Sequence, residues 1–410
     1  MNAFESTAVI SEPSAQRLAA WIMLSRSAGI GPVLIGRLLE AFANPENILA
    51  ASTAQLAQVE GIGHTRAQAI ARGRDELNID ALLEDCNQRQ IRIICPDHAE
   101  WPAGLTRIAD PPTVLYVRGR LLRQDMLAIG VVGARRCTLY GREQSDKFAM
   151  ALAAAGLTIV SGGARGIDTA AHTGALRAGG RTIVVQGCGL GHCYPQENAE
   201  LYDRIVRADG GAVISELPPD EPPLAENFPP RNRIIAGMSL GILVIEANLR
   251  SGSLITARLA ADDYAREVFA LPGRVDSIAS SGTHYLIKTG AAALVDCVED
   301  ILRGLGHTEL IAPTESQNAA VPAPPRSAAR RRVADPPVNS TTAAESEIAA
   351  RSELTAPQKQ IMACFTGEAL SADDLCNSAV LPPSVIMAEL TYLEIAGHLR
   401  RLPDRRYIIQ

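Results

Sequence analysis

The sequence predicts an α/β fold in which a doubly wound, mostly parallel sheet is flanked by a helical N-terminal region and a small C-terminal winged helix. Short runs rich in β-branched residues alternate with helical stretches from about residue 96 to 305: MLAIGVVG, LTIVSGG, RTIVVQG, AVISE, LGILVIEA and EVFALPG. Parallel neighbours need a crossover helix, so this alternation is typical of a parallel sheet. The length of 410 residues allows two or three domains.

Residues 1–95 form the predicted helical region, because apolar residues recur at helical spacing in AAWIMLSRSAGIGPVLIGRLLEAF and AQLAQVEGIGHTRAQAIAR. Both stretches contain a Gly-Ile-Gly turn, at Gly29–Gly31 and Gly61–Gly63. This repeat resembles the helix-hairpin-helix (SAM-like) module, in which N–H groups at a helix start contact a phosphate. A purely structural helical hairpin is an equally good interpretation.

Residues 306–352 are rich in Pro, Ala, Ser and Arg and predict a flexible linker, because they hold too little apolar surface to offset the entropy of ordering. Its run from Arg330 to Arg332 fits a solvated linker better than a nucleic-acid contact. Residues 353–410 hold three helical stretches and the basic hairpin HLRRLPDRRYIIQ, which predicts a winged helix. Its third helix carries Glu389 and Glu394 but neither Lys nor Arg, so we expect it to contact protein, or nothing sequence-specific, rather than to read bases.

The composition favours a cytoplasmic protein without a membrane segment. The longest apolar runs fall short of the roughly 18 residues of a membrane span, and the N-terminus has no basic region of a signal peptide. We therefore expect reduced cysteines. Cys188, His192 and Cys193 lie close together, but adjacent His192 and Cys193 suit a tetrahedral metal site poorly, and we expect no metal. The net charge of −6 means that any binding of nucleic acid needs a local basic patch.

Glycine-rich turns follow the predicted strands and indicate an anion site. The turn from Ser161 to Gly166 lies between a strand and a helix that opens at Ile167, where close backbone approach and free N–H groups favour a phosphate. Neither GxGxxG nor GxxxxGK[ST] follows any predicted strand, so we expect no NAD or ATP cofactor. Similar turns are Gly133–Arg136, Arg231–Arg233 and Arg250–Ser253. Their convergence on one sheet edge predicts an anion-binding ledge long enough for a polymer.

A catalytic role is the alternative for the acidic residues and the histidine near these turns. The candidates for a general acid or base are Asp168, His172, Glu216 and Glu246. Asp168 is explained more simply as a helix cap, His172 as a packed residue and Glu246 as a hydrogen-bond acceptor at a strand end. We therefore expect no catalytic residue.

Several blocks of the middle region resemble the DNA-processing protein A family, known as DprA or Smf. They are GARRCTLYG, SGGARGIDTAAHTGAL, GCGLGHCYPQEN, ISELPP, SSGTHYLIKTGA and the long run NFPPRNRIIAGMSLGILVIEANLRSGSLITARLAADDYAREVFALPG. The resemblance covers roughly residues 100 to 300, and the flanking regions agree with the common layout of that family.

The resemblance implies an extended Rossmann-like fold that binds single-stranded DNA without strong sequence preference. It also implies a homodimer and the loading of the recombinase RecA during natural transformation and homologous recombination, in place of single-strand binding protein. Matching the family motifs onto this chain implies a DNA-binding surface made of Gly133, Arg135, Arg136, Ser161, Gly162, Gly163, Ala164, Gly166, Arg231, Asn232, Arg233, Ser251, Gly252 and Ser253.

The chain departs from the family pattern where an aspartate and a lysine are common, and has Gly191 and Gln196 there. This departure shifts the expected basic contacts to Arg135 and the Arg-Asn-Arg turn. Candidate side chains for stacking on bases are Tyr140, Tyr194 and Phe228. One alternative function is a nucleoside-phosphate hydrolase of a related fold, although its PGGxGTxxE pattern is missing here. Another is a regulatory scaffold that recruits partners through the winged helix.

Overall fold

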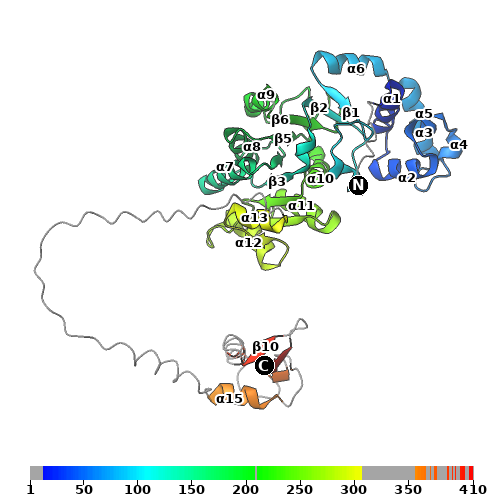
Figure 1. Cartoon of the computed structure of the whole chain (residues 1–410). Coiled ribbons are helices and arrows are strands. Elements are labelled where there is room, and N and C mark those ends of the chain that lie inside the picture. Colours follow the sequence, from blue (N-terminus) through cyan, green and yellow to red (C-terminus); the bar gives the residue numbers. More distant parts are fainter. Residues whose placement is uncertain are drawn as a thin grey trace, which may run out of the picture. The chain divides into compact units, whose positions relative to one another are not determined.

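The computed structural model describes residues 13–207 and 210–306, together with 356–365, 370, 374–375, 386, 390, 393, 398–401 and 406–409. The chain divides into two compact units, residues 1–317 and 318–410 (Figure 1). The predicted linker, which includes Arg330–Arg332, lies outside the described residues except for Gly306. Glu389 and Glu394 of the predicted third helix also lie outside them. Among the residues described, no helix combines the length and the apolar character needed to cross a membrane.

A nine-stranded sheet forms the centre of the first unit, in the order β1-β2-β6-β5-β4-β3-β7-β8-β9. The strands from β3 onward pair in parallel with one another, whereas β1–β2 and β2–β6 are antiparallel. The strands are β1 Arg92–Ile94, β2 Leu115–Gly119, β3 Ala128–Val132, β4 Thr158–Ser161, β5 Thr182–Val185, β6 Gly211–Ser215, β7 Gly241–Val244, β8 Glu267–Ala270 and β9 Ala293–Leu294.

Helices cover both faces of this sheet (Figure 1). Ile129 and Val131 of β3 pack in a cluster with α7, α8 and α13, whereas Ala128 and Val132 pack on the other side with α10, α11 and α12. This alternation follows from the period of two in a strand, and it explains why the parallel strands read as continuous apolar runs. The helices are α7 Leu139–Ala154, α8 Ile167–Arg177, α9 Ala199–Arg207, α10 Phe228–Met238, α11 Ser253–Arg258, α12 Ser281–Lys288 and α13 Val298–Gly304.

The six strands expected from the sequence are confirmed as β3 to β8. Sequence reasoning missed β1, β2 and β9. β1 and β9 have only three and two residues, too few for a periodic pattern to stand out. β1 also lies before residue 96, so the sheet already begins inside the stretch that the sequence assigned to the helical region.

Six short helices form the N-terminal part, and they pack against β1, β2 and α9 through one apolar cluster. Arg66 joins the two Gly-Ile-Gly turns, because its guanidinium donates hydrogen bonds to the carbonyls of Gly29 (3.0 Å) and Gly61 (2.7 Å). The helices are α1 Ala15–Ser25, α2 Pro32–Phe42, α3 Pro45–Ala50, α4 Thr53–Leu56, α5 Gly63–Glu76 and α6 Ile79–Gln88.

The second unit contains helix α15 (Ala356–Ala363) and the antiparallel strands β10 (Leu399–Arg401) and β11 (Tyr407–Ile409). Its small core joins helix and strands through buried side chains, among them Ile361, Leu399 and Tyr407. The two strands correspond to the basic hairpin that predicted the wing.

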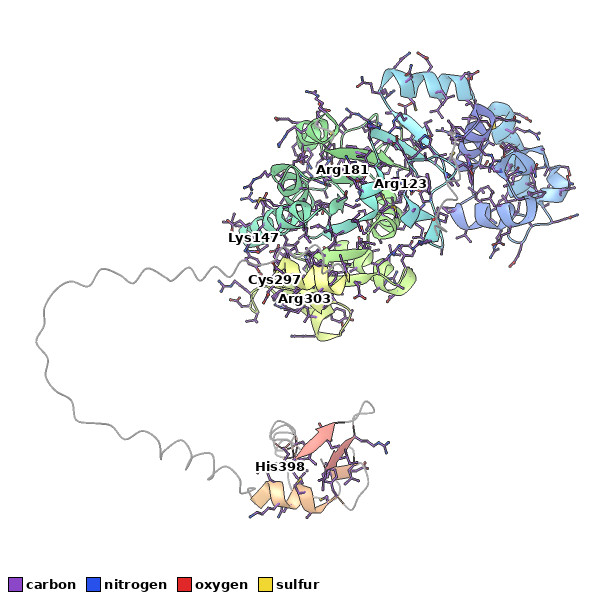
Figure 2. The ribbon with its side chains drawn as sticks, viewed as in Figure 1. Arg123, Lys147, Arg181, Cys297, Arg303 and His398 are labelled. Carbon is purple, nitrogen blue, oxygen red and sulfur yellow. The ribbon has the colours of Figure 1, made fainter. Side chains whose placement is uncertain are left out.

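A buried ion pair fixes the amino-terminal end of the central strands. Arg181 (Figure 2), just before β5, donates to both carboxylate oxygens of Asp125 at 2.8 and 2.9 Å. Asp125 also accepts hydrogen bonds from the Thr158 hydroxyl and the Leu122 N–H. Since the carboxylate is buried and fully bonded, losing the arginine leaves a buried charge without its cation.

We predict that Arg181→Ala lowers the free energy of unfolding by about 3 kcal/mol, the cost of breaking a buried pair from one side. Urea unfolding followed by circular dichroism measures this. The matched control is Arg177→Ala, whose ion pair with Asp146 lies at the surface and should contribute at most about 1 kcal/mol. Equal losses in the two variants would contradict the assignment.

Candidate nucleic-acid interface

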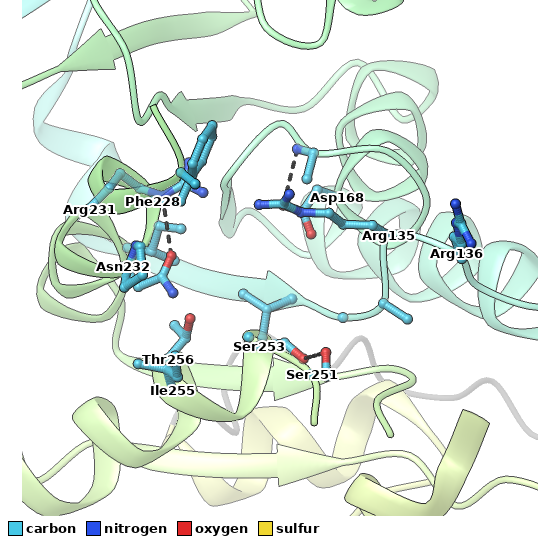
Figure 3. Close-up of a pocket in the computed structure, with 18 of the residues that line it drawn as sticks. Arg135, Arg136, Asp168, Phe228, Arg231, Asn232, Ser251, Ser253, Ile255 and Thr256 are labelled. Atoms are coloured by element: carbon cyan, nitrogen blue, oxygen red, sulfur yellow. Dashed lines mark hydrogen bonds between the residues drawn. The ribbon is translucent and has the colours of Figure 1, made fainter. Parts of the chain in front are cut away.

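A pocket opens at the carboxyl edge of the sheet, where the strand order changes direction. From β3 the sheet continues to one side through β4, β5 and β6, and to the other through β7 and β8. Loops that diverge from such a point leave a crevice beyond the strand ends. The crevice holds a cavity of about 540 Å³, shown in Figure 3. The predicted residues that line it are Gly133, Arg135, Arg136, Ala164, Arg231, Asn232, Ser251, Gly252 and Ser253.

The turn after β3 carries the exposed arginines Arg135 and Arg136. Gly166, with φ of +80°, lets the start of α8 approach this turn, since a Cβ there would lie 2.5 Å from the Ala134 carbonyl and 2.7 Å from that of Arg135. In Figure 3 Arg135 extends toward Asp168, while Arg136 turns to the opposite side. One turn therefore directs two cations to different places.

An aromatic side chain forms part of the pocket lining. Phe228, at the first position of α10, has the guanidinium of Arg135 5.1 Å from its ring centroid and that of Arg231 at 5.9 Å. The ring of Tyr194 packs against Phe228 with centroids 5.3 Å apart. Tyr140 does not line this pocket, because its hydroxyl donates to the Pro272 carbonyl instead. Two of the three candidate stacking residues are thus brought together.

Arg231 lies beneath this ring and is only 5% exposed. Its guanidinium donates to the carbonyls of Gly162 (2.8 Å) and Val185, and to the amide oxygen of Asn232 (3.2 Å). Burial lowers the pKa of Arg231 to about 10, against the opposing effect of Asp168. A Cβ on Gly162 would come within 2.6 Å of this guanidinium, so the glycine in the turn makes room for the arginine.

Arg233 points away from the pocket, into a different polar cluster. Its side chain is 8% exposed and pairs with Glu216 at 2.5 Å and Asp110 at 3.4 Å. Burial raises the pKa of Glu216, although Arg233 opposes this change. The Tyr264 hydroxyl donates to the same Asp110 at 2.7 Å. This predicted DNA contact therefore joins α10 to β6 and two neighbouring segments.

The turn after β4 supports the pocket from below. Ser161 is fully buried and its hydroxyl donates to the Val131 carbonyl at 2.6 Å. The Gly163 carbonyl accepts hydrogen bonds from Tyr202 and Asn198. Ser161, Gly162 and Gly163 do not line the cavity, and only Ala164 of this turn does.

The start of α11 forms the remaining wall. The hydroxyls of Ser251 and Ser253 lie 2.8 Å apart and hydrogen-bond to each other. Ile255, Thr256 and Asn248 also line the pocket, and sequence reasoning missed them. Two of them could have been found, because Ile255 and Thr256 stand three and four residues after Gly252 and so share its helix face.

The four candidate acids and bases each have a structural partner. Asp168 accepts the Ala164 N–H at 3.2 Å, and burial raises its pKa to about 6. His172 contacts the Thr182 hydroxyl at 2.6 Å, and burial lowers its pKa to about 3. Glu246 accepts both the N–H and the hydroxyl of Thr138, which caps α7. Asp168 is the one acidic side chain among the residues that line the pocket.

Cys188, His192 and Cys193 do not bring their potential ligand atoms together into one close group. The Cys188 thiol donates to Gln186, and that of Cys193 to the Pro195 carbonyl. Within the described part of the chain, the one close group of potential ligands is Asp296, Cys297 and Asp300, where Asp296 is exposed.

Comparisons with known proteins match all three regions. Residues 92–306 match the family described as DNA recombination-mediator protein A, residues 341–405 a DprA winged helix domain, and residues 23–74 a SAM-like helix-hairpin-helix tandem. Protein Smf of Synechocystis sp. is 35% identical, over 95% of this chain and 98% of its own. Protein Smf of Escherichia coli is 37% identical, over 80% of this chain and 79% of its own. The solved structure of DNA processing protein A from Streptococcus pneumoniae is 34% identical with a TM-score of 0.59, over 72% of this chain and 98% of that one.

We predict that the buried carboxyl of Asp168 makes folding less favourable as the pH rises from about 4 to about 6, because its pKa in the folded protein, about 6, lies above the ordinary value of 3.8. Asp168→Asn removes this contribution. The variant should therefore gain stability relative to the wild type with rising pH across this window, by no more than about 3 kcal/mol.

Urea unfolding of both proteins at several pH values measures that difference. The contribution of His172 to the pH dependence of stability cancels in the difference, because both proteins contain it. A difference that stays constant with pH would show that Asp168 titrates normally.

Proposed function

The chain belongs to the DNA recombination-mediator protein A family, whose members include DprA and Smf, and from this premise we propose that it binds single-stranded DNA without strong sequence preference and loads RecA onto it. The activity would serve natural transformation and homologous recombination in the cytoplasm. The observation that carries the proposal is the pocket in which an exposed arginine, Arg135, lies over the ring of Phe228 at the switch point of the sheet. In such an arrangement the cation can bind a phosphate group while the aromatic face stacks on the base of the same strand.

Phosphate groups are the proposed ligands of Arg135, with Ser251, Gly252 and Ser253 on the facing wall. Contacts of this kind position a strand but carry no sequence information, which fits binding without strong preference. The net charge of −6 gives the whole protein no general attraction to nucleic acid, so binding depends on these local cations.

Stacking on a base is the proposed role of Phe228. Its ring is partly exposed, lines the cavity and is fixed from one side by Tyr194. A rigid aromatic face holds any base, because every base has a π-face. We therefore favour Phe228 over Tyr140, whose hydroxyl is bonded outside the pocket.

The buried members of the predicted site take a supporting role in this proposal. Arg231 holds the carbonyls of Gly162 and Val185, so it positions the turn after β4 and the ring above it. Arg233 pairs with Glu216, and the Ser161 hydroxyl donates to the Val131 carbonyl. Direct contacts with the strand then fall to Arg135, Arg136, Asn232 and the α11 start.

Binding without catalysis fits the pocket better than nucleoside-phosphate hydrolysis. The lone carboxylate of the lining, Asp168, already accepts a backbone N–H, and hydrolysis would need a base free to activate water. Incubation of the purified protein with nucleotides tests this alternative, since release of free base would support the hydrolase function.

A homodimer formed through the Rossmann-like domain is part of the proposal. Four large apolar side chains between residues 275 and 294 are exposed: Val275, Ile278, Tyr285 and Leu294. β9, at one edge of the sheet, lies in the same stretch with both residues exposed. Exposed apolar side chains in the same stretch as an open strand edge favour association with a second copy.

We predict that Arg135→Gln weakens binding to single-stranded oligonucleotides about tenfold, or about 1.4 kcal/mol, and that it lowers the slope of log K against log salt by about 0.7. Fluorescence anisotropy at several salt concentrations measures both quantities. Arg123→Gln, which removes an exposed arginine outside the pocket, is the matched control. Tighter binding of duplex than of single strands, or equal effects of the two variants, would refute the proposed site.

We predict that Ile278→Glu with Tyr285→Glu yields a monomer, because two buried charges would oppose the proposed apolar interface. Light scattering after size-exclusion chromatography gives the mass. Val33→Glu, at an exposed apolar position in α2, is the control and should leave the dimer intact. The same samples, added to RecA and strands coated with single-strand binding protein, show whether filament formation needs the dimer. A monomeric wild type would contradict the proposal.

A further inference from the structure

A second cavity, of about 770 Å³, opens on the far side of the turn that carries Arg135 and Arg136. Both arginines line both cavities, so this turn is the ridge between them. The walls of the second cavity come from the first turns of α7, the start of α8 and the segment around Glu197. We call it the arginine groove and define it by Arg135, Arg136, Arg142, Arg165, Glu143 and Glu197.

The charges of the arginine groove are unbalanced in favour of cations. Arg135, Arg136 and Arg142 are exposed, and among the described residues they form no ion pair. Of the three acidic residues in the lining, Asp146 pairs with Arg177 and Glu197 pairs with Arg165. Because the Arg135 guanidinium lies over Phe228 in the first pocket, two unpaired arginines, Arg136 and Arg142, are left in the groove beside one unpaired carboxylate, that of Glu143. Such a surface attracts an anion with several charges.

The lining of the groove differs from that of the first pocket in chemistry. It contains no aromatic side chain, whereas the first pocket has Phe228 and Tyr194. Its polar lining includes the arginines, the three carboxylates already described, Asn198, hydroxyl residues such as Thr169, and the first turn of α7. A site of this composition holds a phosphate backbone but offers no face on which a base can stack.

We propose that the arginine groove is a second track for the sugar-phosphate backbone of the same strand, which crosses the Arg135–Arg136 ridge after leaving the first pocket. This inference rests on the proposed function of that pocket. Arg136, which turns away from the first pocket in Figure 3, makes the crossing contact, and Arg142 binds the next phosphates along α7. The bases over the groove stay unstacked by protein and face solvent, where they are free to pair.

The ion pair between Arg165 and Glu197 sets how strongly the groove binds. Both side chains are 55% exposed, so solvent screens their attraction and the pair opens readily. Removing the Glu197 charge frees Arg165 for a phosphate and also removes a repulsive group. Glu197→Gln should therefore strengthen binding, the opposite of the effect of losing Arg142.

The test compares a short oligonucleotide of about 5 nucleotides, which fills only the first pocket, with one of about 20 nucleotides, which reaches the groove. Arg142→Gln should leave the affinity for the short strand unchanged and weaken the long strand about threefold to tenfold. Its salt slope on the long strand should fall by about 0.7 for each lost phosphate contact. Glu197→Gln should raise the affinity for the long strand and leave the affinity for the short strand unchanged.

Lys147→Gln is the matched control, because Lys147 is exposed on the same helix (Figure 2) but lines neither cavity. If Arg142→Gln and Lys147→Gln behave alike on both strands, the groove is not a track, although the first pocket still binds. If the wild type fails to bind even the long strand, the proposed function itself is wrong and the groove proposal fails with it. Arg142 forms no ion pair, so its loss should not alter folding, which thermal unfolding verifies.

Discussion

The architecture of the pocket depends on the burial of one charged side chain, that of Arg231. A guanidinium removed from water must find acceptors, and here the carbonyls of Gly162, just after β4, and Val185, the last residue of β5, supply them. These bonds tie α10 to two strand ends at once. Because Phe228 stands one helical turn before Arg231 on α10, fixing the arginine also fixes the ring above it. The exposed Arg135 then meets an aromatic face that is already in place.

The same helix is anchored on its other side by Arg233, whose pairs with Glu216 and Asp110 lie away from the pocket. The sequence Arg-Asn-Arg therefore divides its three residues among three tasks. Arg231 bonds to the ends of β4 and β5, Asn232 lines the cavity, and Arg233 connects α10 to Glu216 directly after β6. A motif that predicts a single basic patch from the sequence becomes, in the fold, one half-buried lining residue and two buried anchors. The exposed cationic surface belongs instead to the turn after β3.

The sequence was sufficient for the parallel strands β3 to β8, because their apolar runs and crossover helices leave few other arrangements. The sequence also correctly predicted that the turns after β3 and β7 lie at the same edge of the sheet, since the carboxyl ends of parallel strands meet at one edge. The sequence could not show that Arg135 is exposed and Arg233 buried, because the burial of Arg233 depends on its pairing with Glu216, and with Asp110, which lies far away in the chain. Phe228 was one of three aromatic candidates, and only the contact with two arginines distinguished it.

The distribution of free arginines bears on why the ligand should be a polymer. A mononucleotide would fill one pocket and satisfy Arg135, leaving Arg136 and Arg142 exposed without a counter-ion on the other side of the ridge. Unpaired like charges beside one another cost free energy unless an anion bridges them. A continuous backbone satisfies both sides of the ridge with one ligand, and the entropy of immobilisation for the second contact is largely spent by the first. Because the protein has a net charge of −6, much of its surface repels phosphate groups. Cations gathered along one path hold the strand there and keep it away from that negative surface.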